Sequence, residues 1–320
     1  MEKERLRLMV KVCQLYFQEG LNQQSIASRY GISRSQVSRM ITAAKAEGVV
    51  EITIRNPFSD ESALEKELLE RFRLRDVIVV DTTEAESGMA DVLLAQAGAA
   101  FLETVFNDGD VIGVMAGKSI TALAKELKDP QKRNLQFVPL IGGWGSEGAD
   151  WHANSNVSLM AKNAKGGHWL LHAPAIVSSE DIKQKLMAEP EIEKVLNLSR
   201  RANIAVIGIG QISERATFVQ STNINAGELS IIKSEGVVGS ICTSFINENG
   251  EEMVKDLSNR MLGLSGEEIK NIPQVIAIAR GEVKAKAIHA SLKGNWLDVL
   301  ITDMATAKQV LEIEKNMGEK

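Results

Sequence analysis

Residues 23–40 read QQSIASRYGISRSQVSRM, and this spacing predicts two short helices joined by a tight turn. Ile26 and Ala27 fall on the inner side of the first helix, and Ala27 is small enough to let the second helix cross close to it. Gly31 can supply the left-handed backbone conformation that reverses the chain. Ser33 can then cap the second helix. Together these features predict a helix-turn-helix.

The second helix of this pair separates an apolar face from a polar one. Val37, Met40 and Ile41 form the apolar, inner face. The outer face carries side chains that hydrogen-bond base edges and phosphates, on a helix of the width that a major groove admits. These are Ser33, Arg34, Ser35, Gln36, Ser38 and Arg39. We therefore predict that this face binds double-stranded DNA, the alternative being an ordinary helical hairpin with a polar surface.

The distribution of charge agrees with that prediction. Residues 1–56 contain nine Lys or Arg and five Asp or Glu, which gives a net charge of +4, whereas the whole 320-residue chain has a net charge of -5. A basic module on an acidic body is expected where only one end of a protein contacts phosphates.

The segments around this motif set the expected domain boundaries. A helical stripe of Leu6, Met9, Val10, Cys13 and Phe17 precedes it, and alternating apolar residues at 49–55 predict a β wing after it. Residues 59–72 have a leucine-rich helical face, which packs either onto its own domain or against another copy. We expect a winged DNA-binding domain at 1–56, a linking helix within 57–75 and a larger domain at 76–320.

The larger domain has the pattern of an α/β fold with a mainly parallel sheet. Apolar runs alternate with amphipathic helical stretches, such as residues 89–106 and 283–292, which indicates strands buried on both faces. The runs lie at residues 77–80, 111–114, 137–141, 169–171, 204–208, 275–278 and 299–301. Ligands of such sheets bind at the carboxyl ends of the strands, so we looked for a site in the turns that follow them.

Four turns contain candidate ligand-binding residues. Gly117, Lys118 and Ser119 open a helix after a strand and suit an anion, although Ile112 stands where a nucleotide-binding P-loop needs glycine. Lys284 starts a later helix, also after a strand, and suits the same anion. The remaining candidates are the paired glycines Gly142 and Gly143 and the hydrogen-bonding side chains His152 and Asn154, although Asn154 can equally cap a helix.

Catalysis, metal binding and membrane insertion find no support in the sequence. The four histidines lie in no recognisable triad or metal motif, and Cys13 and Cys242 have no partner at metal-ligand spacing. We therefore expect a non-enzymatic protein without metal or cofactor. A charged amino terminus and the absence of a long apolar run predict a cytoplasmic protein that does not contact membranes.

The whole chain resembles the SorC family of bacterial transcriptional regulators, which includes regulators of glycolytic genes and of deoxyribonucleoside catabolism. The resemblance rests on an ordered series of segments that begins with the helix-turn-helix. The others are residues 109–114, 137–143, 237–242, 272–277, 284–288 and 299–307. It implies an effector domain similar to the sugar isomerase and CoA-transferase superfold, which binds sugar phosphates without processing them. It also implies dimers or tetramers on palindromic or repeated operators.

The resemblance also assigns candidate ligand residues. Ser119 stands where family members have small hydroxyl residues that bind a phosphate. Lys284 stands where the family also has its typical residue. Ser240 stands where an acidic residue commonly receives sugar hydroxyls, and Ile141 stands where some members have a basic residue. These departures imply one anionic site rather than two, and a ligand that need not resemble fructose bisphosphate. The resemblance as a whole implies a repressor controlled by a small phosphorylated sugar or a related carbohydrate. A sugar-phosphate isomerase or lactonase with an accessory DNA-binding module, and a DNA-binding scaffold without a ligand, are the alternatives.

Overall fold

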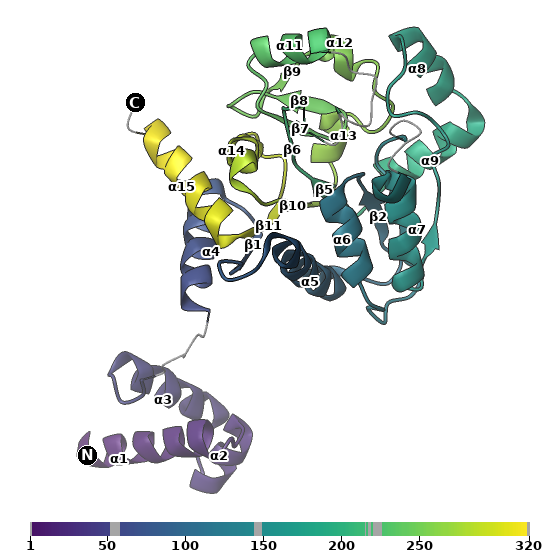
Figure 1. The fold of residues 1–320 in the computed structure, drawn as a ribbon. Helices are drawn as coiled ribbons and strands as arrows, with labels where there is room; N and C mark the ends of the chain where they lie inside the picture. The colour runs from purple at the N-terminus through teal and green to yellow at the C-terminus, as the bar shows by residue number, and fades with distance from the viewer. Residues whose placement is uncertain are drawn as a thin grey trace. The chain divides into compact units, whose positions relative to one another are not determined.

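The computed structural model describes residues 2–51, 58–143, 149–214, 216, 219 and 226–318 (Figure 1). The chain divides into two compact units, Met1–Pro57 and Phe58–Lys320, and each is described by itself. Within the described residues no helix is both long and apolar enough to cross a membrane.

The small unit is helical. Its elements are α1 (Glu2–Cys13), the π-helix η1 (Gln14–Gln18), α2 (Gln23–Tyr30) and α3 (Arg34–Ala46). The predicted turn between α2 and α3 is confirmed, because Gly31 is left-handed with φ 64° and ψ 32°. Ser33 Oγ accepts the Gln36 N–H at 3.2 Å, while Gln36 Oε1 accepts the Ser33 N–H at 2.8 Å. This reciprocal pair is a capping box that fixes where α3 begins.

The core of the small unit differs from the predicted stripe along the first helix. Leu6, Val10 and Phe17 are exposed, whereas Val12 and Leu15 are buried. The π-helical turn at η1 changes the angular phase of the side chains, which turns Leu15 inward and Phe17 outward. The predicted wing begins in a bend at residues 49–50, and its residues 52–55 lie outside the described residues.

Substituting alanine for Ser33 should destabilise the small unit by about 1 kcal/mol, because the α3 N–H groups lose their cap. Urea unfolding of the small unit, followed by circular dichroism, measures this change. Ser28→Ala is the matched control, since Ser28 lies exposed on α2 and its hydroxyl bonds only the Gln24 carbonyl of the same helix. Equal stability of the two variants would contradict a stabilising role for the capping box.

The large unit contains, within the described residues, a seven-stranded sheet in the order β1-β11-β10-β5-β2-β3-β4 (Figure 1). Every pairing in this sheet is parallel, which confirms the predicted α/β class with a mainly parallel sheet. The strands are β1 (Asp76–Val80), β2 (Val111–Val114), β3 (Gln136–Pro139), β4 (Gly167–His168), β5 (Ile204–Gly208), β10 (Gln274–Ile278) and β11 (Val299–Asp303).

Helices cover both faces of the parallel sheet, as the two-sided apolar runs require. Ile204 and Val206 of β5 pack into a core beneath α5, α6 and α7, whereas Ala205 and Ile207 pack into the core on the opposite face. The helices are α4 (Ser59–Phe72), α5 (Ser87–Val105), α6 (Lys118–Glu126), η2 (Ala149–Trp151), α7 (Ala153–Asn163), α8 (Glu180–Met187), α9 (Pro190–Arg200), α11 (Ala226–Ser234), α12 (Lys255–Ser258), α13 (Gly266–Lys270), η3 (Glu282–Lys284), α14 (Ala285–Lys293) and α15 (Met304–Gly318).

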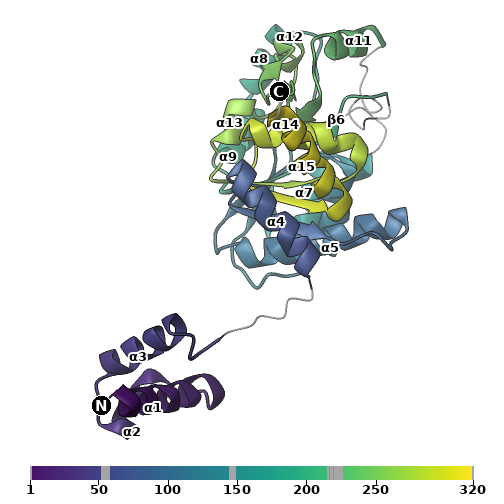
Figure 2. The same cartoon turned by 90° about the vertical axis from the view of Figure 1, so that its left-hand side faces the viewer.

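The helix α4 packs onto the large unit, which decides between the two alternatives for its apolar face. Leu68 and Phe72 are buried, and the Glu65 carboxylate accepts the Val79 N–H of β1 at 3.0 Å. Figures 1 and 2 show α4 beside α15, and Lys315 of α15 pairs with Glu67 at 3.3 Å.

Two features of the large unit differ from the sequence prediction. The strand predicted at residues 169–171 is the two-residue β4 at 167–168, because the Asn154 side chain bonds both the N–H and the carbonyl of Leu171 and replaces a ladder there. A second, antiparallel sheet was not predicted, since strands of two or three residues leave no periodicity to detect. It consists of β6 (Gly210–Gln211), β7 (Gly239–Ile241), β8 (Ser244–Ile246) and β9 (Glu252–Met253).

Candidate functional site

A cavity of about 200 Å³ lies where the strand order of the parallel sheet reverses. The chain proceeds from β2 outward to β4 on one side and from β5 through β10 and β11 on the other, so that the neighbours β2 and β5 form the switch point. Crevices at such points are where open α/β sheets bind ligands. The cavity is lined by residues 115–120 after β2, residues 208–211 after β5, and by Trp151, Ala216, Ser240 and Lys284.

The first turn of α6 forms one wall of this cavity. Gly117 precedes it with φ 142° and ψ 151°, a conformation that favours glycine. The N–H groups of residues 118–120 have no acceptor within the helix, and such groups attract anions. The predicted effector-binding residues Gly117, Lys118 and Ser119 all line this cavity, and their binding of an effector stays a prediction.

A buried hydrogen-bond network fixes this turn. The Gly117 N–H donates to the Trp151 carbonyl at 2.8 Å. The Asn156 side chain is fully buried, donates to the Met115 carbonyl at 3.1 Å and accepts from the Thr121 hydroxyl at 2.8 Å. These bonds join the loop after β2 to η2 and α7, so the anion-attracting turn is held in place before any ligand binds.

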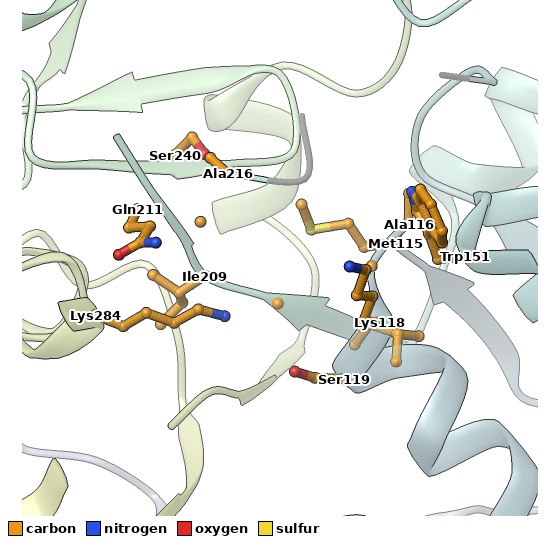
Figure 3. A pocket seen from close by; sticks show the side chains of 14 residues that line it. Met115, Ala116, Lys118, Ser119, Trp151, Ile209, Gln211, Ala216, Ser240 and Lys284 are labelled. Atoms are coloured by element: carbon orange, nitrogen blue, oxygen red, sulfur yellow. The ribbon is translucent and has the colours of Figure 1, made fainter. Parts of the chain in front are cut away.

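Two lysines reach into the cavity from opposite sides. In Figure 3 the side chains of Lys284 and Lys118 extend into the same open space from opposite sides, and the Ser119 hydroxyl lies below them. Among the described residues no carboxylate lies within 4.0 Å of either ammonium group. Lys118 is instead stacked over the Trp151 ring, 5.1 Å from its centroid. Two lysines without a carboxylate of the described residues within ion-pair distance favour an anionic ligand in so small a cavity.

Burial lowers the pKa of Lys284, and the positive charge of Arg280 lowers it further, whereas Asp91 raises it. Arg280 itself is engaged by carboxylates: its Nε lies 2.5 Å from Asp91 Oδ1 and its Nη1 lies 3.3 Å from Asp303 Oδ2. Asp303 also accepts the Thr306 N–H at 2.9 Å, and the Thr306 hydroxyl accepts the Gly281 N–H at 2.7 Å. This network anchors the loop that leads from β10 to Lys284.

The lowered pKa of Lys284 predicts that anion affinity depends on pH. An anion favours the ammonium form, so affinity should fall as the pH rises through the lowered pKa, at a pH below the ordinary lysine range. Calorimetric titration with inorganic phosphate above about pH 8.5, where phosphate is almost entirely the dianion, measures this. Lys284→Arg should bind phosphate with little pH dependence, since a guanidinium stays charged. The same pH profile in both proteins would rule out Lys284 as the titrating group.

Four predicted effector-binding residues lie outside the described lining of this cavity: Gly142, Gly143, His152 and Asn154. The two glycines pack against the backbone at Ala173. A Cβ on Gly142 would lie 2.6 Å from the Ala173 carbonyl oxygen, and the Gly143 N–H donates to that oxygen at 2.9 Å. The Asn154 amide is occupied by Leu171, and His152 is the residue before α7. Ser240 and Lys284 do line the cavity.

Trp151, Gln211 and Asn156 are the site residues that the sequence reasoning did not select. Trp151 and Asn156 belong to the same segment as His152 and Asn154, so the segment was identified but its contributing side chains were not. Gln211 lies on β6, in the antiparallel sheet that the periodicity did not reveal. The described lining contains no carboxylate, histidine or cysteine. Among the described residues no group of three potential ligands could hold a metal ion.

The polar face of α3 is a second candidate site, on the small unit. Arg34 and Arg39 are exposed, and Arg39 Nε donates to the Ser35 carbonyl at 3.4 Å. Ser33 and Ser35 share a hydrogen bond of 2.9 Å between their hydroxyls, and Gln36 is engaged in the capping box. Ser38 is half-buried. Arg34 therefore offers the most accessible charged group on this face.

Comparison with known proteins identifies relatives of this chain. The family model described as "Putative sugar-binding domain" matches residues 56–312. The deoxyribonucleoside regulator of Bacillus subtilis (strain 168) is 27% identical, over 97% of this chain and 99% of that protein. The central glycolytic genes regulator of the same organism is 32% identical, over 78% of this chain and 72% of that protein.

The fold comparison agrees with the sequence comparison. The crystal structure of the full-length sorbitol operon regulator SorC from Klebsiella pneumoniae matches with a TM-score of 0.76 and 26% identity, over 96% of this chain and 98% of that one. These relatives are named as transcriptional regulators and not as enzymes, in agreement with the expectation from the sequence.

Proposed function

The chain belongs to the SorC-type family of sugar-binding transcriptional regulators, and we propose that it is a repressor controlled by a small ligand. The small unit binds operator DNA through α3 and represses transcription. The cavity at the switch point binds a small phosphorylated sugar, which changes the affinity of the protein for that operator.

The arrangement of positive charge in the cavity carries this proposal. Lys118 and Lys284 face each other without a described carboxylate partner, next to the free N–H groups at the start of α6. A phosphate would accept hydrogen bonds from the helix start and from both ammonium groups, and the Ser119 hydroxyl would add a further donor. Ser240 and Gln211 lie on the other side of the cavity and would contact sugar hydroxyls.

The α3 face supports the DNA half of the proposal. Its side chains have the chemistry of major-groove recognition, and the capping box presents them at a helix start of defined geometry. Arg34 suits a bidentate contact with guanine. The assignment of individual contacts to Ser33, Ser35, Gln36, Ser38 and Arg39 remains a prediction.

Coupling between the two sites requires that the effector bind the DNA-competent and DNA-incompetent states with unequal affinity. A continuous set of contacts is available for this within the large unit. The loop that carries Lys284 is bonded to Thr306 of α15, and α15 packs against α4, the helix that follows the small unit in the chain. We propose that effector binding at Lys284 acts through this route.

The repressor is expected to act as a homo-oligomer, a dimer or a tetramer. Two recognition helices that read half-sites about 34 Å apart, one turn of DNA, need a fixed relation between two copies. Light scattering in the presence of operator DNA should give at least twice the 34.9 kDa mass of one chain. A monomer on the operator at micromolar protein concentration would exclude this arrangement.

A thermal-shift screen tests the effector half of the proposal. Phosphorylated sugars should stabilise the large unit, whereas their unphosphorylated counterparts should not, because only the former place an anion between the lysines. A ligand at 100 times its dissociation constant adds about 2.7 kcal/mol of stability. Stabilisation by the neutral sugars to the same extent would contradict an anion-dependent site.

A further inference from the structure

The side chain of Trp151 stands between two cavities. One is the cavity at the switch point, and the other, of about 330 Å³, lies between α5 and α6. Trp151 and Lys118 line both, while Thr121 and Lys125 of α6 line only the second. In Figure 3 the indole is seen edge-on at the side of the first cavity, beside Met115 and Ala116. The stacked pair of Trp151 and Lys118 therefore acts as a partition.

The backbone of Trp151 is fixed, but its indole is not tied by a hydrogen bond. The carbonyl accepts the Gly117 N–H at 2.8 Å, which locks the residue to the start of α6. The indole Nε1 is buried and has no hydrogen-bond partner among the described residues. Rotation of the side chain would break only its packing and the stacking with Lys118, and the unpaired N–H would gain from a ligand oxygen.

The volumes of the two cavities indicate that the partition would limit the size of the ligand. The first cavity is smaller than the pockets of about 300–1,000 Å³ that hold drug-sized ligands, whereas the two cavities joined would fall within that range. A phosphate with a short carbon chain suits the first cavity alone. A longer sugar phosphate, anchored by the same lysines, needs the space that the indole closes off.

We infer that Trp151 sets the size of the effector, admitting short phosphorylated sugars and excluding longer ones. This inference rests on the proposed function, since it assumes that the phosphate is held by Lys118 and Lys284. The Trp151 side chain would act on the ligand directly, through contact at the cavity wall.

Calorimetry on the full-length chain with three probes tests this inference: inorganic phosphate, glycerol 3-phosphate and glucose 6-phosphate. Trp151→Ala should raise the affinity for glucose 6-phosphate relative to glycerol 3-phosphate by tenfold or more. Because the Trp151 ring also stacks on Lys118, inorganic phosphate serves as the reference: it should still bind, and the affinity of each larger probe is expressed relative to it. Trp151→Phe keeps a ring at the wall and should retain the preference of the parent. Trp151→Leu should give an intermediate shift and provides a second variant if the alanine protein does not fold.

The outcomes separate this inference from the function on which it rests. The ratio of the affinities for glucose 6-phosphate and glycerol 3-phosphate could stay unchanged in folded Trp151→Ala or Trp151→Leu while inorganic phosphate still binds. That result would overturn the role of Trp151 as a partition and leave the anion site intact. Failure of the parent to bind any of the three probes would overturn the anion site and the inference with it.

Discussion

Arg34→Ala is expected to weaken operator binding by about 1–3 kcal/mol, roughly 5- to 150-fold, if the guanidinium makes a bidentate contact with a base. Arg34 is exposed at the first position of α3, where the capping box leaves its side chain available. The loss should depend on the operator sequence, because a phosphate contact would weaken binding to all DNA about equally. Fluorescence anisotropy with the operator and with single-base variants measures both effects.

The control for Arg34→Ala must remove the same charge elsewhere. Lys66→Ala does so on α4, where the exposed Lys66 makes only a 3.9 Å pair with Glu70. Gln36→Ala is a poorer probe than Arg34→Ala, because the Gln36 side chain also caps α3 and its removal would disturb the helix. Equal operator affinity of Arg34→Ala and Lys66→Ala would remove α3 from the DNA interface.

Lys284→Ala is expected to lower the affinity for a phosphorylated effector at least tenfold. Charge-assisted hydrogen bonds contribute about 1.5–3 kcal/mol each to binding. Lys284 lines the cavity, and its ammonium group forms no ion pair with a carboxylate of the described residues, so its charge is available to the ligand. Calorimetry with the ligand from the thermal-shift screen measures the change. Lys118→Ala should show a similar loss, although removing Lys118 also uncovers the Trp151 ring.

Lys286→Ala is the matched control for this substitution. Lys286 lies two residues further along the chain, is exposed on α14 and is absent from the described cavity lining, so its removal changes the net charge equally. The affinity of Lys286→Ala for the phosphorylated effector should stay within about twofold of that of the parent. If Lys284→Ala also binds like the parent, the effector site lies elsewhere in the chain.

The parts of the fold that the sequence predicted are those where one periodic signal dominates. Strands such as β5 are apolar on both sides and sit between amphipathic helices, so their place in a covered parallel sheet follows from pattern alone. The turn at Gly31 and the cap at Ser33 were predictable because each needs a particular residue type. The exposure of Phe17 was not, because a π-helical turn shifts the side-chain phase without a residue signature.

The candidate site also contains features that the sequence predicted and features that only the packing reveals. Lys118 and Lys284 are 166 positions apart, yet the rule that parallel strands end at one edge was enough to predict that they meet. Asn154 and Asn156 are alike by sequence, and only the packing shows that Asn154 bonds the chain after β4 while Asn156 holds the loop after β2. Trp151 has no signature for a cavity wall, because its role depends on the space on both of its sides.

The most direct test measures operator affinity with and without the phosphorylated sugar that gives the largest thermal shift. The ligand should lower the operator affinity of the parent, and operator DNA should lower ligand affinity by the same factor, because coupling is reciprocal. In Lys284→Ala the operator affinity should persist and its response to the same ligand concentration should disappear. A ligand that saturates the cavity of the parent and leaves operator affinity unchanged would contradict regulation through this site.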